Sequence, residues 1–374
     1  MIQLAQLEKS VERVVRVAAE NAIEVDAAGT FPRRAMDALA SEGLLGLTSA
    51  TEVGGGGQGL RAAAGVVEAL AGSCASTAMV TMMHYCAVAV VEAHAPLEVR
   101  REVATGRKLG TLAFSEAGSR SHFWAPLSTA TADGDRVLLE ADKSWVTSAG
   151  EADLYIWSSR PLAAEGASSL WLVPAGTGGV EVGGNFNGLG MRGNDSRPMT
   201  ARRAAVPASA GLGPDGSGFD IMMGVVLPWF QVLNSAASIG IAEAAVGKTA
   251  AHAGKARFEH LNQTLADQPV NRYHIARMRI QTDQAKALLL DTLTAIESSR
   301  TDAMLRVLEV KASASEAAIA VTDLAMRACG GAAFRKEVGV ERNFRDARAS
   351  TVMAPTTDAL YDFIGKAVCG LPLF

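Results

Sequence analysis

The chain has 374 residues, and 49% of them are hydrophobic, so it can form two or three domains around a large buried core. Its formal net charge of −4 argues against a nucleic-acid binder, because such proteins usually present a basic face. Only 5% of the residues are aromatic, and this low share favours closely packed helices over an aromatic-rich β-sandwich.

The N-terminal residues, 1–9, lack a basic segment followed by an apolar run, so no secretory signal is predicted. The most apolar stretch, 66–94, is interrupted by Glu68, His84 and Glu92. It therefore predicts buried helices, and we expect no integral membrane segment. The cysteines are widely spaced and form no C-x-x-C pair, which predicts neither a zinc site nor a disulfide framework and favours a reducing cytoplasm. They are Cys74, Cys86, Cys329 and Cys369.

Residues 3 to about 110 have apolar side chains at helical spacing, and Pro32 can begin a helix at its first position. Short β-like segments bounded by turn residues then follow, from Thr111 to about Pro207. Long amphipathic runs return after the glycine-rich loop 211–218. The pattern predicts an α+β multidomain chain. Its parts are an N-terminal helical domain (1–110), a β-barrel-like middle domain (111–212) and a C-terminal four-helix bundle (213–374).

Signatures of metal or nucleophile chemistry do not stand out. The six histidines are scattered without an H-E-x-x-H pattern, and neither G-x-S-x-G nor a P-loop is present. The glycine-rich segment 54–59 does not follow a strand and lacks the Lys-Ser/Thr of a phosphate-binding loop, so a plain turn is predicted. We expect no bound metal.

Five segments carry the chemistry, and their order along the chain matters. They are 113–121 (AFSEAGSRS), 145–153 (WVTSAGEAD), 188–196 (GLGMRGNDS), Arg257 with Gln268, and 329–331 (CGG) with 340–348 (VERNFRDAR). The first is a strand end followed by small residues, which let backbone amides approach a flat polar ring or a phosphate. On a regular strand, Trp145 and Thr147 would face the same side and offer one ligand an aromatic plane and a hydroxyl.

Together these segments resemble the acyl-CoA dehydrogenase superfamily, with its T-E-P-x-x-G-S loop, W-I-T-N/S-x-G-E-A-D strand, G-x-R-x-S-D-T turn, bundle Arg, and G-G followed by V-E-R-x-x-R-D-A. The resemblance covers about residues 40 to 360 in order. It implies an FAD-dependent oxidoreductase that oxidises an acyl thioester, such as an acyl-CoA, or a related small molecule. FAD would lie between the middle and C-terminal domains.

The resemblance also implies which residues bind FAD. In the middle domain, they are Phe114, Ser115, Gly118 and Ser121 in the flavin loop and Trp145, Val146 and Thr147 on the strand against the ring. In the helical bundle, they are Arg257, Gln268, Arg327, Gly330, Gly331, Thr356 and Asp358. Arg257 would pair with the FAD pyrophosphate of a neighbouring subunit, which suits a bidentate guanidinium. Sharing of this kind implies a homotetramer or homodimer, or a heteromer.

The chain departs from the family where the catalytic base belongs. The family's Glu, 23 residues after the second Gly of the G-G pair, corresponds to Ala354, whose backbone N–H could still bind a thioester carbonyl. The alternative Glu on a bundle helix corresponds to Phe230, and the neighbouring Arg corresponds to Gln231. The implied substrate-pocket residues are Phe230, Ala354 and His122, and the last replaces a common Asp of the family loop.

Three interpretations remain open at this stage. The base could be relocated, with Asp358, Glu116 and His122 as candidates. The chain could be a flavin-dependent monooxygenase on the same scaffold, because small Ala354 leaves space beside the ring. It could also be a non-catalytic subunit that completes a partner's FAD site. The redox partner is likewise open between an electron-transfer flavoprotein and a flavin reductase.

Overall fold

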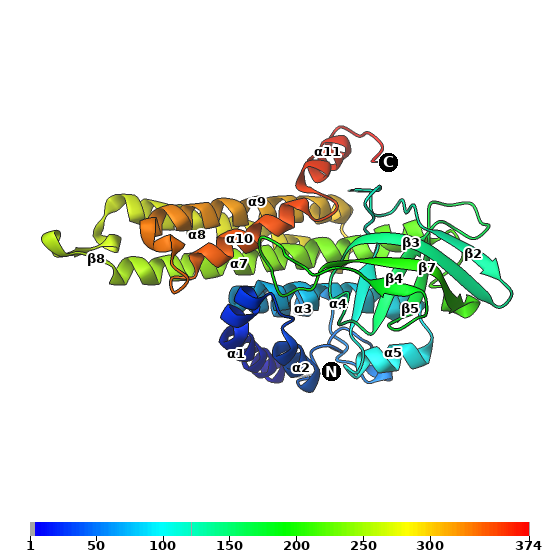
Figure 1. Ribbon diagram of the computed structural model, residues 1–374. Coiled ribbons are helices and arrows are strands. Elements are labelled where there is room, and N and C mark those ends of the chain that lie inside the picture. Colours follow the sequence, from blue (N-terminus) through cyan, green and yellow to red (C-terminus); the bar gives the residue numbers. More distant parts are fainter. Residues whose placement is uncertain (1–3, 121, 374) are drawn as a thin grey trace. The chain divides into compact units, whose positions relative to one another are not determined.

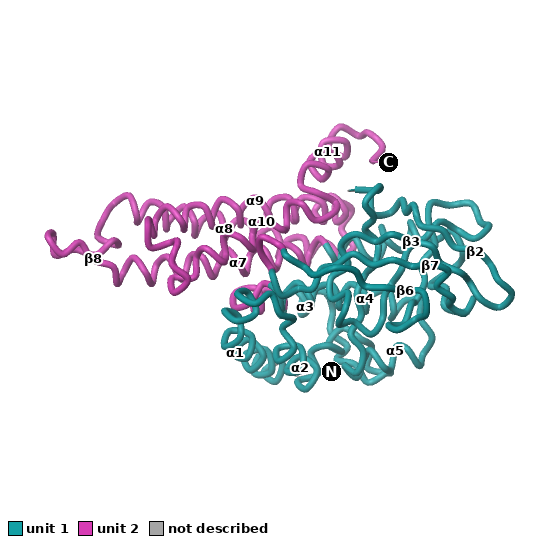
Figure 2. Tube along the Cα trace, viewed as in Figure 1, with its two compact units in different colours: residues 1–66, 76–187, 192–230 teal, residues 67–75, 188–191, 231–374 magenta. Residues whose placement is uncertain are grey.

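The structure is a computed structural model that describes residues 4–120 and 122–373. The chain has two compact units (Figure 2). Unit 1 comprises the chain up to Val66 with 76–187 and 192–230, and unit 2 comprises 67–75, 188–191 and 231–374. The order of helices, strands and helices that the sequence predicts is confirmed (Figure 1).

The N-terminal part is helical. Its helices are α1 (Leu4–Ala28), α2 (Arg33–Ser41), α3 (Leu60–Ser73), α4 (Ala75–His94) and α5 (Leu97–Ala104), with the short 3₁₀ turn η1 (Thr51–Val53). Within the described residues, three helical stretches are long and apolar enough to span a membrane by length and hydropathy alone: 75–94, 218–255 and 303–334. In the first, 89% of the apolar window is buried inside the protein, as the sequence predicts.

Two consecutive side chains of α4 hydrogen-bond to the backbone of the segment after α2 and of the first residue of the β region. Tyr85 Oη donates to the Leu44 carbonyl at 2.7 Å, and His84 Nε2 lies 3.0 Å from the Leu45 carbonyl. His84 Nδ1 accepts the backbone N–H of Gly110 at 3.0 Å. Because Nδ1 is the acceptor, the ring proton is on Nε2 and donates to Leu45. Burial lowers the pKa of His84 to about 4, so this histidine is neutral and structural at pH 7.

The middle part consists of two sheets. One has the strand order β1 (Gly110–Ala113), β4 (Leu154–Ser159), β5 (Ser169–Pro174), and the other has the order β2 (Thr129–Asp133), β3 (Arg136–Val146), β7 (Arg197–Pro207), β6 (Val180–Val182). β1 and β4 are parallel, and the remaining pairs of both sheets are antiparallel.

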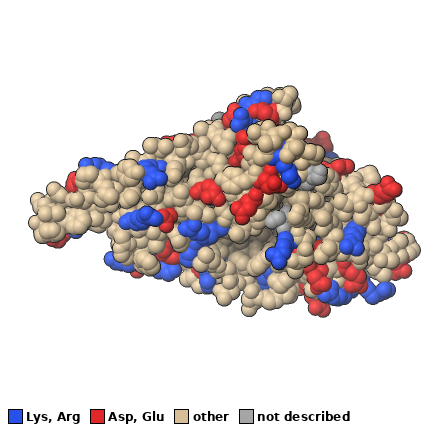
Figure 3. Space-filling view, turned by 90° about the horizontal axis from the view of Figure 1, so that it is seen from above, with Lys and Arg blue, Asp and Glu red and all other residues tan. Residues whose placement is uncertain are grey.

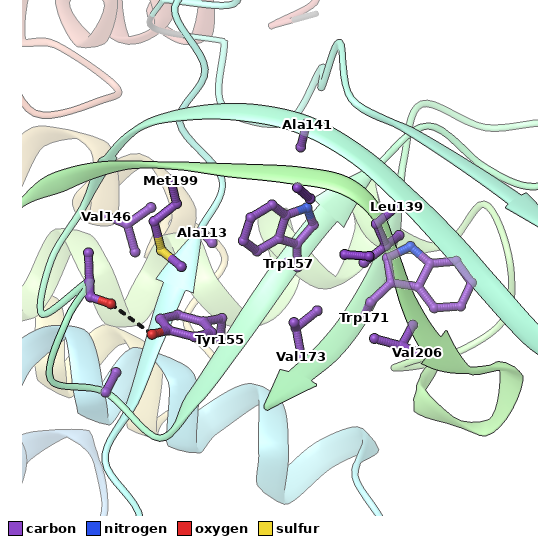
Figure 4. Packing of buried hydrophobic residues seen from close by; sticks show 14 of the residues in the cluster. Ala113, Leu139, Ala141, Val146, Tyr155, Trp157, Trp171, Val173, Met199 and Val206 are labelled. Carbon is purple, nitrogen blue, oxygen red and sulfur yellow. Dashed lines mark hydrogen bonds between the residues drawn. The ribbon is translucent and has the colours of Figure 1, made fainter. Parts of the chain in front are cut away.

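The two sheets share one core. Alternation along β3 buries Val137 and Leu139, as expected for a strand with one face on the core. Figure 4 shows Trp157 and Trp171 from the first sheet in this cluster together with Leu139 from the second. The Tyr155 hydroxyl also lies in the core and donates to the Ala149 carbonyl at 2.7 Å, which ties the turn after β3 to β4. This bond therefore fixes the turn that directly follows residues 145–147, the strand predicted to lie against the flavin.

The C-terminal part is again helical. Its elements are α6 (Gly218–Ile221), the π-helical turn η3 (Met222–Val226), α7 (Leu227–Lys255), the hairpin β8 (Arg257–Phe258) and β9 (Gln263–Thr264), α8 (Pro269–Glu297), α9 (Ala303–Cys329), the 3₁₀ turn η6 (Gly330–Phe334), α10 (Val340–Val352) and α11 (Thr357–Val368). Ala242, Met278, Val321 and Val340 come from α7, α8, α9 and α10 and share one core. These helices form the predicted bundle, and α11 extends it.

Charges are mixed on the visible surface. On the face in Figure 3, Lys and Arg side chains are interspersed with Asp and Glu side chains and do not gather into a patch of one sign. This face therefore offers no basic stripe of the kind that follows a nucleic-acid backbone.

Candidate functional site

The flavin-loop segment after β1 is fixed by one buried carboxylate. Glu116 Oε2 accepts the backbone N–H groups of Leu127 at 2.6 Å and Ser128 at 3.1 Å. Its Oε1 accepts from the Ser128 hydroxyl at 2.5 Å and from Lys143 Nζ at 2.6 Å. Burial opposes ionisation, but the Lys143 charge and these hydrogen bonds outweigh it and lower the pKa of Glu116. Glu116 is thus an ionised anchor of the loop.

The loop itself keeps an exposed backbone. Ala117 and Gly118 are exposed, and a Cβ at Gly118 would collide with Leu127 Cδ1. The neighbouring positions are less open: Phe114 is buried and stacks on Phe123 with ring centroids 6.4 Å apart, and Ser115 is half-buried. Glycine at position 118 therefore lets the chain pass close to Leu127 while its amide stays near the surface.

His122 and Ser121 complete this loop in the sequence. His122 is exposed and makes an edge-to-face contact with Trp124, with ring centroids 5.1 Å apart. Its backbone N–H donates to the Ser119 carbonyl at 2.9 Å, which closes the turn. Ser121 lies outside the described residues. The His122 imidazole is therefore free of a hydrogen-bonded protein partner in the described chain and can meet a ligand.

The strand end around Trp145 differs from a regular strand. The register shifts between Lys143 and Val146, and β3 ends at Val146. Trp145 is 66% exposed and meets Phe186 edge to face at 6.4 Å. Val146 and Thr147 are buried, and the Thr147 hydroxyl lies 3.1 Å from the Ser196 hydroxyl. Trp145 and Thr147 therefore do not share the environment expected on a regular strand: the indole is open and the hydroxyl has a protein partner.

In unit 2, Arg257 and Gln268 flank the β8–β9 hairpin at one end of the bundle (Figure 1). Arg257 is exposed, and its guanidinium donates to Asn262 Oδ1 at 2.6 Å. The Gln268 amide donates to Gln263 Oε1 at 2.8 Å, directly before α8. Both side chains are held at the hairpin and keep donor capacity for a ligand.

The end of α9 offers open backbone beside a cation. The Arg327 side chain is 67% exposed and pairs with Asp323 at 2.9 Å, one turn earlier. Gly330 has φ +57° and ψ −141°, a conformation that only glycine adopts readily. A Cβ at Gly330 or Gly331 would meet nothing within 4 Å, and Phe334 in the same turn is 81% exposed.

Of the remaining predicted positions, Ala354, Thr356 and Asp358 lie at the start of α11 or just before it, and Phe230 lies on α7. The Thr356 hydroxyl caps this helix by accepting the Ala359 N–H at 3.4 Å, and Asp358 is exposed in its first turn, where a helix N-terminus favours an acidic charge. Ala354 and Phe230 are half-buried, and neither position carries a carboxylate. The α11 end and the β8–β9 end are opposite ends of the bundle in Figure 1.

One residue near Ala354 was missed by sequence reasoning. Lys311 on α9 is fully buried and donates from Nζ to the backbone carbonyls of Met353 at 2.8 Å and Pro355 at 2.6 Å. The only sequence signal is a lysine on the otherwise apolar face of the 303–329 run. Such a signal does not say which distant loop the amine contacts.

These features fit FAD. The exposed Trp145 offers a flat apolar surface, and the neighbouring Ser144 N–H donates to the Ser115 carbonyl in the loop after β1. The exposed guanidinium groups of Arg257 and Arg327 and the open backbone at Gly330 and Gly331 are donors of the kind that bind a pyrophosphate. The described residues contain no His, Cys, Asp and Glu grouping that could hold a metal ion.

Family models match almost the whole chain. The models described as acyl-CoA dehydrogenase N-terminal, middle and C-terminal domains match residues 3–105, 111–204 and 216–369. They follow one another in the order that the predicted domains have.

Curated relatives are similar over most of their length. The chain is 27% identical over 361 residues to cyclohex-1-ene-1-carbonyl-CoA dehydrogenase of Syntrophus aciditrophicus (strain SB), which covers 95% of this chain and 86% of the relative. It is 28% identical over 345 residues to the mitochondrial short-chain specific acyl-CoA dehydrogenase of Homo sapiens, covering 90% and 82%. Among solved structures, butyryl-CoA dehydrogenase from Megasphaera elsdenii superposes with a TM-score of 0.90 over 99% of both chains at 21% identity.

Proposed function

Because the chain belongs to the acyl-CoA dehydrogenase family of FAD-dependent oxidoreductases, we propose that its substrate is a CoA thioester with a small acyl group. The observation that carries the proposal is the match of all three successive domain models. The named relatives supply the size of the acyl group, since they act on short-chain or cyclohexene-carbonyl thioesters by their names. Full-length similarity of this kind favours the dehydrogenase over the monooxygenase and the non-catalytic subunit.

The residues proposed to hold FAD fall into two groups. The loop at Gly118 and the exposed Trp145 would hold the ring, and Arg257, Gln268 and the Gly330–Gly331 backbone would hold the pyrophosphate and the adenine half. When bound, FAD supplies the acceptor for the substrate hydride. The protein's share of the reaction is to hold the thioester, exclude water and accept the α-proton.

The Ala354 backbone is the proposed partner of the thioester carbonyl. Its N–H has no hydrogen-bond partner among the described residues, and the residue is half-buried. A free donor of this kind can stabilise the negative charge that develops on the carbonyl oxygen when the α-proton leaves. Since Glu116 already accepts four hydrogen bonds, the exposed side chains of His122 and Asp358 remain the candidates for the base.

The visible spectrum tests the proposal first. We expect purified protein to carry a flavin spectrum, and anaerobic butyryl-CoA, isobutyryl-CoA and cyclohex-1-ene-1-carbonyl-CoA to bleach it to different extents. A protein that takes up no FAD on reconstitution would contradict the cofactor site. Flavin that no acyl-CoA bleaches, but that NAD(P)H and oxygen turn over, would contradict the dehydrogenase.

A pair of surface variants tests the ring site. Trp145→Ala should weaken FAD binding about tenfold or more, because the open indole loses its contact with the ring. Val368→Ala is the matched control, since Val368 is also an apolar side chain, 71% exposed, on α11. Equal dissociation constants for FAD in the two variants, measured by flavin fluorescence, would remove Trp145 from the site.

We also propose a homodimer or homotetramer. Within unit 2, Lys311 beside Ala354 and Arg327 beside Gly330 are 16 residues apart on α9, about 24 Å along the helix. Residues at the two ends of the bundle would then serve different FAD molecules, as sharing between subunits requires. α8 presents exposed Tyr273 and Ile280 on one face, which suits a subunit contact. Light scattering of wild type and Ile280→Glu tests this, and a monomeric wild type would contradict it.

The compartment and the electron acceptor are the remaining parts of the proposal. No disulfide joins the cysteines of the described chain, and three of them are buried, which suits a reducing cytoplasm. An electron-transfer flavoprotein is the proposed acceptor. Rapid reoxidation of the substrate-reduced protein by such a flavoprotein, with slow reoxidation by oxygen, is the expected result. Faster reoxidation by oxygen would contradict it.

A further inference from the structure

Lys311 is a buried amine that holds one particular stretch of backbone. Its side chain is fully buried on α9, and Nζ donates to the carbonyls of Met353 and Pro355 at 2.8 Å and 2.6 Å. No ion pair of Lys311 is found within the described chain. These two carbonyls belong to the residues on either side of Ala354, so the amine holds the Met353–Ala354 peptide and the Pro355–Thr356 peptide.

The geometry of the peptide sets the direction of the Ala354 N–H. The Met353–Ala354 peptide is trans and planar, so its N–H points opposite to its carbonyl. Because the Met353 carbonyl points at Lys311, the Ala354 N–H points away from the buried amine. That N–H is also the one with no hydrogen-bond partner in the described chain.

Burying the Lys311 amine costs free energy, and its hydrogen bonds to the 353–355 backbone offset part of that cost. Burial lowers the pKa of Lys311 to about 7, and the two carbonyl dipoles are its polar contacts. From α7, the Asn234 amide meets Met353 Sδ at 3.1 Å, so the same residue is contacted from a second helix. An apolar side chain at position 311 would fill the core without this cost but would leave both carbonyls without their donor.

We propose that Lys311 is a positioning residue for the dehydrogenation: it fixes the 353–355 backbone so that the Ala354 N–H is presented to the substrate thioester carbonyl. The inference rests on the proposed function and deepens it. Lys311 itself does not touch the substrate. It acts through the two carbonyls and thereby sets the orientation of the donor between them.

Three variants of the full-length FAD-loaded protein test the proposal. Lys311→Met keeps the length of the side chain and removes the donors, and Lys311→Arg keeps donors at the same position. Ser315→Ala is the matched control, because Ser315 is buried one turn later on α9 and its hydroxyl has no partner in the described chain. The measurements are FAD content, kcat and KM with butyryl-CoA, and hydrogen exchange of the 350–360 peptide without substrate.

For Lys311→Met we expect kcat to fall about 10²-fold with a smaller change in KM and with FAD content retained, because a misplaced donor mainly destabilises the transition state. Exchange at Met353, Ala359 and Leu360 should become faster than in Ser315→Ala. Lys311→Arg should recover part of kcat.

Two results separate this proposal from the proposed function. Unchanged kcat and unchanged hydrogen exchange in Lys311→Met would overturn the role of Lys311. Turnover of acyl-CoA by the wild type would still support the proposed function. Equal losses in Lys311→Met and Ser315→Ala would also overturn it, since they indicate a general packing effect. Conversely, if the wild type does not turn over acyl-CoA but hydrogen exchange is faster in Lys311→Met, the proposed function is contradicted. The role of Lys311 in holding the 353–355 backbone would still be supported.

Discussion

Lys143 Nζ and Glu116 Oε1 lie 2.6 Å apart with side chains 0% and 3% exposed, so the flavin loop is anchored by an ion pair that water does not reach. The Ser158 carbonyl and hydroxyl accept further bonds from Lys143, at 2.8 Å and 3.0 Å. Burial lowers the pKa of Lys143 to about 8, although Glu116 opposes that change.

Removing Lys143 should therefore be expensive. Lys143→Met leaves the Glu116 carboxylate buried without its counter-ion, and such a loss typically costs about 3–5 kcal/mol of unfolding free energy. Urea unfolding at pH 7 measures the cost. Arg202→Met is a suitable control, since Arg202 pairs with Asp142 at the surface and such solvent-screened pairs contribute little to stability. Similar midpoints for the two variants would contradict the anchoring role.

His84 predicts how stability depends on pH. Burial lowers its folded pKa from 6.5 to about 4, so the unfolded chain binds a proton in a range where the folded chain does not. The free energy of unfolding should consequently fall as the pH drops from about 6.5 towards 4, by about 3 kcal/mol in total from this residue.

The comparison of wild type with His84→Gln isolates that contribution. The variant loses stability at pH 7 because the bonds to Leu45 and Gly110 are disturbed, but its unfolding free energy should vary less between pH 7 and pH 5. Parallel pH profiles from urea unfolding would show that His84 does not titrate in this way.

Variants of Gly330 and Gly331, directly after α9, distinguish the effect of backbone strain on stability from the effect of ligand contact on FAD binding. Gly330→Ala forces φ +57° and ψ −141° on a residue with a Cβ and should cost about 1–3 kcal/mol. Gly331→Ala adds a Cβ into open space, so stability should change by less than about 0.5 kcal/mol. Weaker FAD binding by Gly331→Ala at unchanged stability would support a pyrophosphate against this backbone. Unchanged FAD affinity would exclude it.

Restoring a carboxylate at position 354 tests the missing base. Ala354→Glu places an acid where the resemblance predicts the family's base, and turnover of butyryl-CoA should rise about 10²–10⁴-fold if the wild type works without a well-placed base. Ala354→Gln has the same shape without the charge and serves as the control. A lower rate in Ala354→Glu than in wild type would instead indicate a base elsewhere, and His122→Ala and Asp358→Ala would then identify it.

Much of the fold was predictable because its signals are local. Apolar periodicity marked the helices, and turn residues bounded the strands, so their order followed from the sequence. Motif spacing singled out Trp145 and the Gly330–Gly331 pair, whose part in FAD binding stays a prediction. The core shared by the two sheets was harder to predict from the sequence, since the order of strands in a sheet depends on contacts between distant segments.

Other details depended on tertiary context. The strand register is irregular before Val146, and Thr147 lies in the turn that follows. The two-residue alternation of a strand in the sequence does not show such a register shift. The contact of Lys311 with Met353 joins residues 42 positions apart, and a lone lysine in a helical run does not reveal its partner. The missing base at Ala354 stays a prediction from the sequence, and the sequence does not show which side chain holds the backbone there.

The placement of Arg257 and Gln268 at the far end of the bundle has a consequence for the handling of the protein. If one chain completes the FAD site of another, cofactor retention is linked to association by mass action. Dilution should then release FAD together with subunits, and added FAD should shift dissociation to lower protein concentrations. Catalytic competence would in that way depend on how much of the protein is present, as well as on how well each chain is folded.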